Sequence, residues 1–383
     1  MELTRFTEHK TGRVLPIRVG DRQDDWAFVP NPLPPSWTQH PRLWPLIVQA
    51  HSQIARLDGI GQNLVDARLL LRPLQRLEAL SSNSLEGTFV TPTELLLFEA
   101  QKSDAAPAGQ RRTEDWREVL NYDRAIEHGC RLIEQGRELN AALFCELHAM
   151  LLAGGRGRDK RPGAFRNTQV YVGVDRRYIP PPADAVAACV ADLEAYLGAG
   201  DALDPLVRAY VAHYQFEAIH PFHDGNGRLG RLLLSLMIHK WMRLSQPFLY
   251  MSEFFDKNRK DYIEKLYRVS THGEWDEWIE FCLLGTIEQA DSSIRRCQEL
   301  QALKARYQQD AGLTGRRMHT LIDRLFSAPI VTIAEIAEEF DVTYHTAQSD
   351  VERLVRAGIL VQITNQRPKA FVAREIFDIA YVA

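Results

Sequence analysis

The sequence predicts a mainly helical fold with one small β-hairpin and a separate C-terminal module. Residues 116–289 place apolar side chains at helical spacing, and only the stretch around 170–179 alternates like a strand pair. The last 70 or so residues instead give the order helix, tight turn, helix, hairpin. Because 383 residues exceed one compact core, we expect more than one domain.

Composition is that of a soluble globular protein, with 45% hydrophobic and 25% charged residues. The formal net charge of -4 argues against a global basic field that would attract nucleic acid or anionic lipid. Five scattered cysteines without CxxC spacing argue against a disulfide framework or zinc site. No apolar leader or membrane-length stretch is seen, so we expect a cytoplasmic protein without membrane association.

The N-terminal region, 1–110, reads as an extended arm followed by helices. Prolines are dense near residues 30–35, so residues 1–40 are expected to be irregular. One helix is predicted from Pro45 to about Leu57, ended by Asp58 and Gly59. A second is predicted from about Leu64 to Leu80, and 105–109 reads as a loop and boundary.

The central region, 111–290, contains the strand-like pair and the most apolar helix. Residues 170–174 and 178–179 predict a hairpin that lies against helices with one free edge. Helices are predicted at about 183–198 and 204–219. A further helix from about Arg228 is apolar nearly all round, which predicts a central buried helix.

A linker helix at 291–312 is expected to lead to the C-terminal module, 313–383. Thr332 to Glu335 is a capping-box start, a second helix ends before Gly358, and 359–361 with 370–372 read as wing strands. This is the winged-helix order. Eight basic against nine acidic side chains give this module a net charge of -1, which favours protein contact over DNA binding without excluding DNA.

The most informative run is HPFHDGNGRLGR over residues 220–231. Gly225 and Gly227 allow a tight turn and close backbone approach to a ligand. The loop opens into the buried helix, whose free N–H groups and positive dipole end favour an anion. Arg228 and Arg231, three residues apart, suit a polyphosphate.

Two further groups complete the chemistry expected of this run. Asp224 is a hard oxygen ligand beside the anion site, and Mg²⁺ is commonly held by one carboxylate plus substrate phosphates. His220 titrates near neutrality and precedes the loop. Phosphoryl-type transfer needs positioning, charge neutralisation and a base, so the run predicts such a reaction.

The run resembles the Fic/Doc signature HPFx(D/E)GNGRxxR and agrees with it at every specified position. The resemblance implies a helical Fic bundle that moves AMP from Mg·ATP to a protein Ser, Thr or Tyr hydroxyl, with His220 as base and Asp224 on Mg²⁺. Glycine at 227, where related kinases carry lysine, favours AMP transfer. The implied nucleotide-binding set is Glu86, Gly225, Asn226, Gly227, Arg228, Leu229, Gly230, Arg231 and Tyr262.

Three shorter matches accompany the signature. Ser82 to Gly87 resembles the inhibitory pattern (S/T)xxxE(G/N), which implies that Glu86 pairs with Arg231 and blocks the γ-phosphate. The hairpin resembles the flap, and Val170, Tyr171, Val172 and Gly173 would dock the target backbone by strand addition. Residues 250–262 resemble the adenine-side segment, where Tyr262 contacts the ring or only packs. Self-association is common in such proteins, and the oligomeric state stays open.

Other interpretations of these patterns remain. His223 and Asp224 could be the dyad of a metal phosphohydrolase, but the following GNGR and the lack of a partner aspartate spacing argue against it. The same site could remove AMP from a modified protein, with Glu86 aligning a water. The C-terminal module also leaves open a DNA-binding regulator that senses a nucleotide without turnover.

Overall fold

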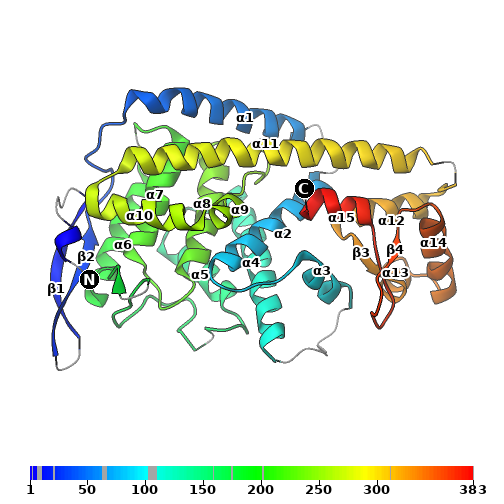
Figure 1. Cartoon of the computed structure of the whole chain (residues 1–383), viewed down its shortest axis with the longest axis horizontal. Helices are drawn as coiled ribbons and strands as arrows, with labels where there is room; N and C mark the ends of the chain where they lie inside the picture. Colours follow the sequence, from blue (N-terminus) through cyan, green and yellow to red (C-terminus); the bar gives the residue numbers. More distant parts are fainter. Residues whose placement is uncertain are drawn as a thin grey trace.

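The computed structural model describes residues 1, 3–6, 11–19, 22–62, 67–101, 110–157, 159–173, 176–200, 202–310 and 312–382. Over these residues the chain is mainly helical, as predicted, with two small antiparallel sheets (Figure 1). No helix in these ranges combines the length and apolar character needed to cross a bilayer.

The elements follow one another as three groups. The first comprises η1 (Leu3–Arg5), β1 (Gly12–Val19), β2 (Arg22–Pro30), η2 (Pro41–Leu43), α1 (Trp44–Gln62), α2 (Ala67–Leu85) and α3 (Pro92–Gln101). The second comprises α4 (Gln110–Glu134), α5 (Ala141–Leu151), η4 (Ala183–Ala185), α6 (Val186–Gly198), α7 (Pro205–Ile219), α8 (Asn226–Trp241), α9 (Ser252–Lys257), α10 (Arg259–His272) and α11 (Trp275–Gln308). The third comprises α12 (Arg316–Ser327), β3 (Ile330–Thr332), α13 (Ile333–Glu339), α14 (Tyr344–Arg356), β4 (Val361–Gln362), β5 (Ala370–Val372) and α15 (Arg374–Tyr381).

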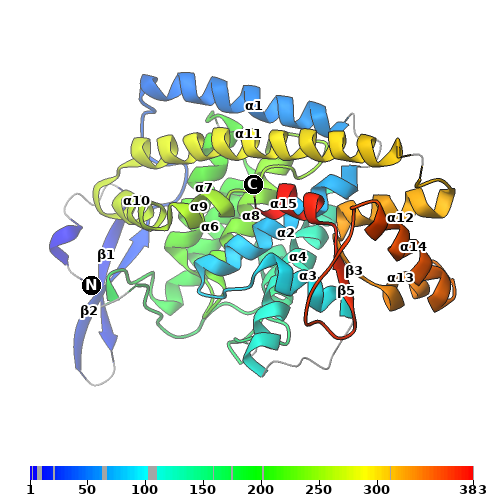
Figure 2. The same cartoon turned by 45° about the vertical axis from the view of Figure 1, so that its right-hand side comes forward.

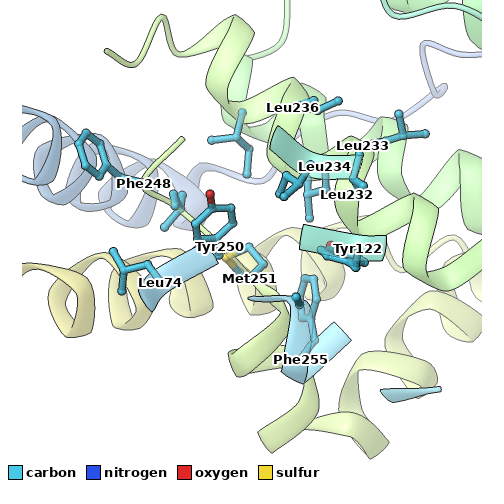
Figure 3. Packing of buried hydrophobic residues seen from close by; sticks show 14 of the residues in the cluster. Leu74, Tyr122, Leu232, Leu233, Leu234, Leu236, Phe248, Tyr250, Met251 and Phe255 are labelled. Carbon is cyan, nitrogen blue, oxygen red and sulfur yellow. The ribbon is translucent and has the colours of Figure 1, made fainter. Parts of the chain in front are cut away.

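Helix α8 is the centre of the core, which confirms the prediction of a buried helix. Leu232 and Leu236 are fully buried, and Leu234 is 1% exposed. Aromatic side chains from other helices, including Tyr122 and Phe255, pack around this helix (Figure 3). Burying each such leucine contributes about 1.5–3 kcal/mol, so the N-terminal end of α8 is held in a fixed place.

Helix α1 is longer than predicted. It continues through Gly59 to Gln62, because Ile54 and Leu57 are buried against the core and tertiary packing outweighs the weak stop signal. Gly61 is packed so closely against the Phe248 ring that a Cβ there would lie 1.9 Å from it. Helix α1 lies beside α11 in both views (Figures 1 and 2).

The prediction of an irregular arm at residues 1–40 was wrong in part. Strands β1 and β2 form an antiparallel hairpin, with Pro16 opposite Trp26. In a two-stranded sheet every strand is an edge, so a proline that lacks an N–H is tolerated. Phe28 is fully buried, and its N–H donates to the carbonyl of Ile179 over 2.8 Å, which attaches the hairpin to the core.

Two other boundaries differ from the predictions. Helix α2 ends at Leu85 instead of Leu80, so the segment around Ser82 is helical. Its expected start at Leu64, and the loop expected at 105–109, lie outside the described residues. Of the hairpin expected near 170–179, the described residues 170–173 and 176–179 form one antiparallel bridge, between Val172 and Tyr178, whose backbones exchange hydrogen bonds of 2.9 and 3.1 Å.

The C-terminal elements pack directly on the helix that leads to Glu86. The capping box predicted at Thr332 and Glu335 is confirmed, and β3, β5 and β4 form one antiparallel sheet in that order. On α2, Arg76 is 3% exposed, pairs with Glu99 at 2.8 Å and donates to the Ser327 carbonyl over 2.5 Å. This buried guanidinium joins α2, α3 and α12.

Candidate active site

The glycine-containing loop between α7 and α8 is held in shape by its own side chains. Asn226 accepts from the Phe222 N–H over 2.8 Å and donates to the Phe222 carbonyl over 2.9 Å. Gly225 has φ +76°, a conformation that glycine adopts without strain. Phe222 is fully buried. Because both polar atoms of the Asn226 amide are bonded to the Phe222 backbone, this amide braces the loop instead of facing a ligand.

His220 lies where α7 ends, in a left-handed conformation with φ +50°. The buried Arg166 holds this backbone: its Nε donates to the His220 carbonyl over 2.8 Å, and its own N–H donates to the Pro221 carbonyl over 2.9 Å. Burial lowers the pKa of His220 to about 4, although Glu86 acts in the opposite direction. The imidazole is therefore neutral at pH 7 and able to accept a proton.

Asp224 lies at the start of the turn, with a side chain that is 44% exposed. Its Oδ1 accepts from the Gly225 N–H over 2.7 Å and lies 3.7 Å from the Arg228 guanidinium. His148 donates from Nε2 to the Asp224 carbonyl over 2.9 Å, and its Nδ1 accepts from the Gly163 N–H. These two contacts fix the tautomer of His148 and hold the backbone of Asp224 in place at the loop.

Among the described residues no cluster of three or more His, Cys, Asp or Glu side chains could hold a metal by itself. The exposed Asp224 carboxylate fits Mg²⁺ only if substrate oxygens supply the remaining ligands, which is the usual arrangement for this ion beside phosphates. The five cysteines are all free thiols in the structure.

Arg231 is buried and joined to the end of α2. Its Nη2 donates to Glu86 Oε1 over 2.8 Å and to the Ser82 carbonyl over 2.8 Å, and its Nε donates to the Ser82 hydroxyl over 2.9 Å. The residues of the short inhibitory pattern therefore meet the last arginine of the glycine-rich run, although 145 positions separate Glu86 from Arg231.

Glu86 lies against the backbone of the loop. A Cβ at Gly227 would fall 2.2 Å from its Oε1, so only glycine leaves room for this carboxylate. Burial raises the pKa of Glu86, but the Arg231 guanidinium prevails and holds the pKa below its usual value. The carboxylate is thus ionised at neutral pH and offsets the positive charge of Arg231.

A cavity of about 360 Å³ opens beside these groups. Its lining includes Glu86, Gly227, Arg231 and His220 at one end and Tyr262, Ile263 and Leu266 at the other. Val172 and Gly173 of the flap segment also line it, together with Arg177. The cavity is therefore polar at the loop and apolar toward α10, which suits a nucleotide with its phosphates at the loop.

Tyr262 lies in this lining but is already engaged. Its ring stacks on Phe255 with 4.3 Å between centroids, and its hydroxyl lies 2.9 Å from Nε2 of His213. His213 also contacts the Gly230 carbonyl at 3.1 Å, so both ring nitrogens have partners within the fold. Leu229 is fully buried and faces the core.

Three residues of the site were missed by sequence reasoning. Arg166 and His148 act on backbone carbonyls from segments 54 and 76 positions away, so no local pattern marks them. Glu217, one helical turn before His220, lines the cavity, and burial raises its pKa to about 7. The available signal for Glu217 was that it is the one carboxyl side chain of a helix that ends at His220.

Two family models match the chain: the Fic/DOC family N-terminal model over residues 44–131 and the Fic/DOC family model over residues 138–238. The chain belongs to the Fic/DOC family. The second match contains the whole glycine-rich loop and His220, and the first contains Glu86. The two halves of the Arg231–Glu86 contact therefore come from two matched regions of this Fic protein.

Relatives of this Fic chain include adenylyltransferases. Protein adenylyltransferase fic-1 of Caenorhabditis briggsae is 36% identical over 125 residues, covering 32% of this chain and 24% of the relative. Protein adenylyltransferase Fic of Nematostella vectensis is 29% identical over 203 residues, covering 52% and 44%. The chain thus spans about a quarter to under half of the length of these curated relatives.

Solved structures support the Fic fold over most of the chain. A Fic family protein from Desulfovibrio desulfuricans superposes with a TM-score of 0.58 and 20% identity, covering 89% of this chain and 98% of that one. Fic-1 from C. elegans superposes with a TM-score of 0.54 and 21% identity, covering 66% and 73%. At these identities the likeness shows the fold alone.

Proposed function

We propose that this protein is a protein adenylyltransferase that transfers AMP from Mg·ATP to a Ser, Thr or Tyr hydroxyl. The observation that carries the proposal is the joint lining of one cavity by His220, the loop glycine Gly227 and Arg231. An imidazole, a glycine turn and a guanidinium around one cavity support the roles of base, anion-binding turn and phosphate clamp that we propose for them.

In the proposed reaction the triphosphate lies on the N-terminal end of α8. The neutral imidazole of His220 takes the proton of the incoming hydroxyl. The hydroxyl oxygen then bonds to the α-phosphorus, and the bond from that phosphorus to the bridging oxygen of the leaving pyrophosphate breaks. Loop N–H groups and the guanidinium of Arg228 offset the negative charge of the phosphates.

Asp224 would hold Mg²⁺ together with phosphate oxygens. The ion, when bound, supplies charge neutralisation at the phosphates. Asp224 is suited to this part because its carboxylate is exposed while its backbone is fixed by His148. Gly227 leaves this position without a cationic side chain, which favours transfer of AMP over transfer of phosphate.

The contact of Glu86 with Arg231 supports basal inhibition. A carboxylate on the Arg231 fork competes with the γ-phosphate for the same donors. The ion pair at 2.8 Å occupies the very group that would clamp the end of the triphosphate. The proposed enzyme is therefore held at a low basal rate while Glu86 stays on Arg231.

The flap segment supports a protein acceptor. Val172 is paired with Tyr178 on one side, and Tyr171 is covered by the Arg176 guanidinium at 4.4 Å from its ring centroid. Val172 and Gly173 border the cavity, so a target backbone added along 170–173 would bring a side-chain hydroxyl toward His220. The acceptor can be another protein or a second copy of this chain.

The test is incubation of the purified chain with labelled ATP and Mg²⁺, followed by mass spectrometry. Glu86→Gly should label itself or an added protein with AMP, whereas the wild type should label weakly. His220→Ala in the same background should abolish labelling without loss of ATP binding. A Glu86→Gly variant that binds ATP but adenylylates nothing would contradict the proposal.

Removal of AMP is a second candidate for the same site. It is favoured by the position of Glu86, whose carboxylate lines the cavity and could align a water for attack on a phosphodiester. The two directions give opposite responses. If wild type releases AMP from a protein first modified by Glu86→Gly, and Glu86→Gly does not, the removal reaction is supported.

The C-terminal elements support a winged helix over residues 313–383. Helix α14, which follows α13 after a tight turn, would be the surface that reads DNA or a protein. Arg353 on α14 donates to the Gly312 carbonyl over 2.9 Å, so one of its basic side chains serves the fold. Protein contact is therefore favoured, and duplex binding without salt dependence or site preference would eliminate a DNA-binding regulator.

A further inference from the structure

We propose that Glu118 of α4 is a positioning residue that holds Arg228 at the phosphate loop and ties it to Thr88, just beyond Glu86. The inference rests on the proposed function, because it concerns how the same cavity is made ready for ATP and how Glu86 is retained. Glu118 lies outside the glycine-rich run and the inhibitory pattern, and it does not line the cavity.

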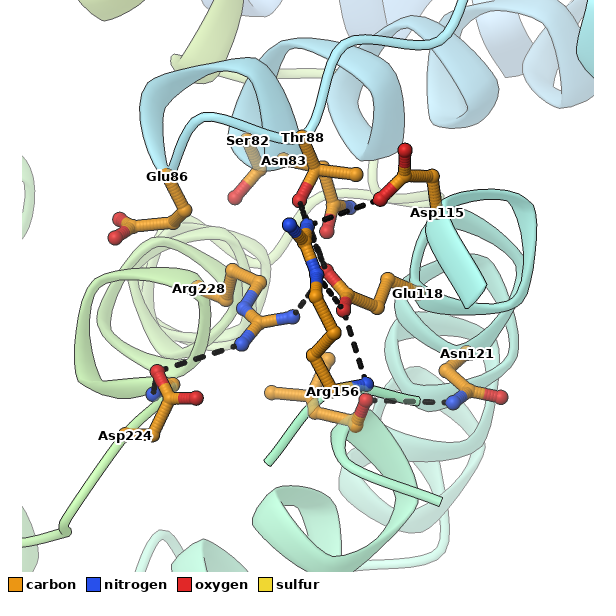
Figure 4. Close-up of polar contacts among 12 residues, drawn as sticks. Ser82, Asn83, Glu86, Thr88, Asp115, Glu118, Asn121, Arg156, Asp224 and Arg228 are labelled. Carbon is orange, nitrogen blue, oxygen red and sulfur yellow. Dashed lines mark hydrogen bonds and ion pairs between the residues drawn. The ribbon is translucent and has the colours of Figure 1, made fainter. Parts of the chain in front are cut away.

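Glu118 is the meeting point of four segments (Figure 4). Its Oε2 accepts from the Thr88 hydroxyl over 2.9 Å and from Arg228 Nη1 over 3.2 Å. Arg156, in the segment after α5, donates to Oε1 through Nε over 2.9 Å and through its backbone N–H over 3.2 Å. The residue is 2% exposed, so these donors replace water around it.

The charges in this cluster are balanced, which keeps Glu118 ionised. Burial raises the pKa of Glu118, but the hydrogen bond from Arg156 and the charge of Arg228 prevail and lower it. Asp115 shares Arg156 at 3.1 Å. Two carboxylates and two guanidinium groups thus meet at the base of the loop, and a neutral side chain at 118 would leave Arg228 facing the cationic Arg156.

Arg228 depends on Glu118 for its orientation. Its Nη1 is 3.2 Å from Glu118, while its Nη2 is 3.7 Å from Asp224, the residue proposed for Mg²⁺. Its Nε finds no hydrogen-bond partner within the described residues. If Asp224 turns toward a metal, Glu118 remains as the carboxylate that keeps this guanidinium beside the loop.

Thr88 extends this arrangement to the inhibitory segment. Gly87 turns with φ +82°, and the Thr88 N–H donates back to the Asn83 carbonyl over 3.0 Å. Ser82 and Glu86 bind Arg231, and Thr88 binds Glu118, which holds Arg228. The segment 82–88 is therefore fastened to Arg231 of α8 through Ser82 and Glu86 and, through Glu118 of α4, to Arg228 at Thr88, so the Thr88 hydroxyl opposes the departure of Glu86.

The experiment compares isosteric variants in two backgrounds. Glu118→Gln in Glu86→Gly should lower kcat for AMP transfer about 10-fold or more, because a loosened Arg228 no longer fits the phosphates. Glu118→Asp should recover part of this loss. Asp350→Asn, which removes a buried carboxylate of α14 from its pair with Arg317 of α12, is the matched control and should leave both kcat and KM for ATP unchanged.

Thr88→Val tests the link to Glu86. In the wild-type background it should raise basal AMP transfer several-fold and speed backbone hydrogen exchange in 82–88. In Glu86→Gly it should leave kcat unchanged, because the brake is already absent. A merely structural role would lower stability in both backgrounds without this difference.

Failure of the two ideas can be told apart. If Glu86→Gly transfers no AMP, the proposed function fails, but the inference about Glu118 can still be tested. Calorimetric titration of Mg·ATP into His220→Ala/Glu86→Gly, with and without Glu118→Gln, tests whether Glu118 positions Arg228. Glu118→Gln is expected to weaken that binding. Hydrogen exchange in Thr88→Val tests whether Thr88 holds the segment 82–88. A Glu118→Gln variant no different from Asp350→Asn, or unchanged exchange in Thr88→Val, would overturn the inference.

Discussion

Ser82 holds Arg231 by two separate hydrogen bonds, one to its hydroxyl over 2.9 Å and one to its backbone carbonyl over 2.8 Å. Arg231 is thus held by hydrogen bonds from α2 as well as by the charge of Glu86, and both contacts belong to the proposed inhibition. Substitution of Ser82 can remove only the first of these bonds, which makes a graded test of inhibition available.

Ser82→Ala should release inhibition in part. Loss of one hydrogen bond of about 0.5–1.5 kcal/mol should raise basal AMP transfer about 2- to 10-fold, less than Glu86→Gly does. The rate of AMP incorporation from labelled ATP measures the effect. Ser84→Ala, in the same turn of α2, is the control, and an equal rise there would remove the specific role of Ser82.

Arg166 should matter for rate more than for nucleotide binding. Arg166→Met removes the support of the His220 carbonyl, so in the Glu86→Gly background kcat should fall by about 10- to 100-fold. The Kd for ATP, measured by calorimetry, should change little, because Arg166 does not line the cavity. Lys160→Met nearby should have no effect, and an equal loss of ATP binding in Arg166→Met would contradict this assignment.

The pH dependence follows from the lowered pKa of His220. A base must be neutral, and a pKa of about 4 keeps the imidazole neutral down to about pH 5. In the Glu86→Gly background, kcat/KM should therefore not fall from pH 8 to pH 6 through this group. The pH profile of kcat/KM is best measured on Glu86→Gly/Glu217→Gln, because this variant lacks the neighbouring Glu217 carboxyl, whose pKa is raised to about 7. An acidic limb with a midpoint near the ordinary histidine value would show the shift to be absent.

Glu217 makes stability depend on pH in a defined direction. Its folded-state pKa of about 7 lies above the ordinary glutamate pKa of 4.5, so protonation favours the folded state. This contribution is fully present below pH 4.5 and is lost as pH rises through about 7. Glu217→Gln should therefore raise Tm relative to wild type at pH 8 and not at pH 4.5. Equal Tm differences at both values would exclude this titration.

The glycine-rich loop was predictable because its chemistry is local. Residues 220–231 are consecutive, so the turn, the helix start and the arginine pair follow from spacing alone. The contact of Glu86 with Arg231 spans 145 positions and came from a family resemblance, not from any local pattern. Arg166 and His148 bind backbone carbonyls, which carry no residue identity, so the sequence offered no trace of them.

The errors in the fold have a similar cause. Gly59 and the early prolines are real local signals, but burial of α1 and pairing of β1 with β2 outweigh them. The capping box at Thr332 was read correctly because both of its hydrogen bonds lie within one helical turn. Features set by hydrogen bonds within one helical turn were therefore predicted correctly, whereas helix ends and strand pairing that depend on packing against the core were not.

Helix α11 runs without interruption from Trp275 to Gln308, a rise of about 50 Å. Trp278 at one end is buried in the core beneath α7, whereas Lys304 near the other end pairs with Asp323 of α12 at 2.9 Å. A cut within residues 291–308 would expose Leu300 and Leu303, both buried in the intact chain, and leave an apolar surface in contact with water. If the regions before and after this helix are expressed separately, we therefore expect precipitation unless all of α11 stays with one of them.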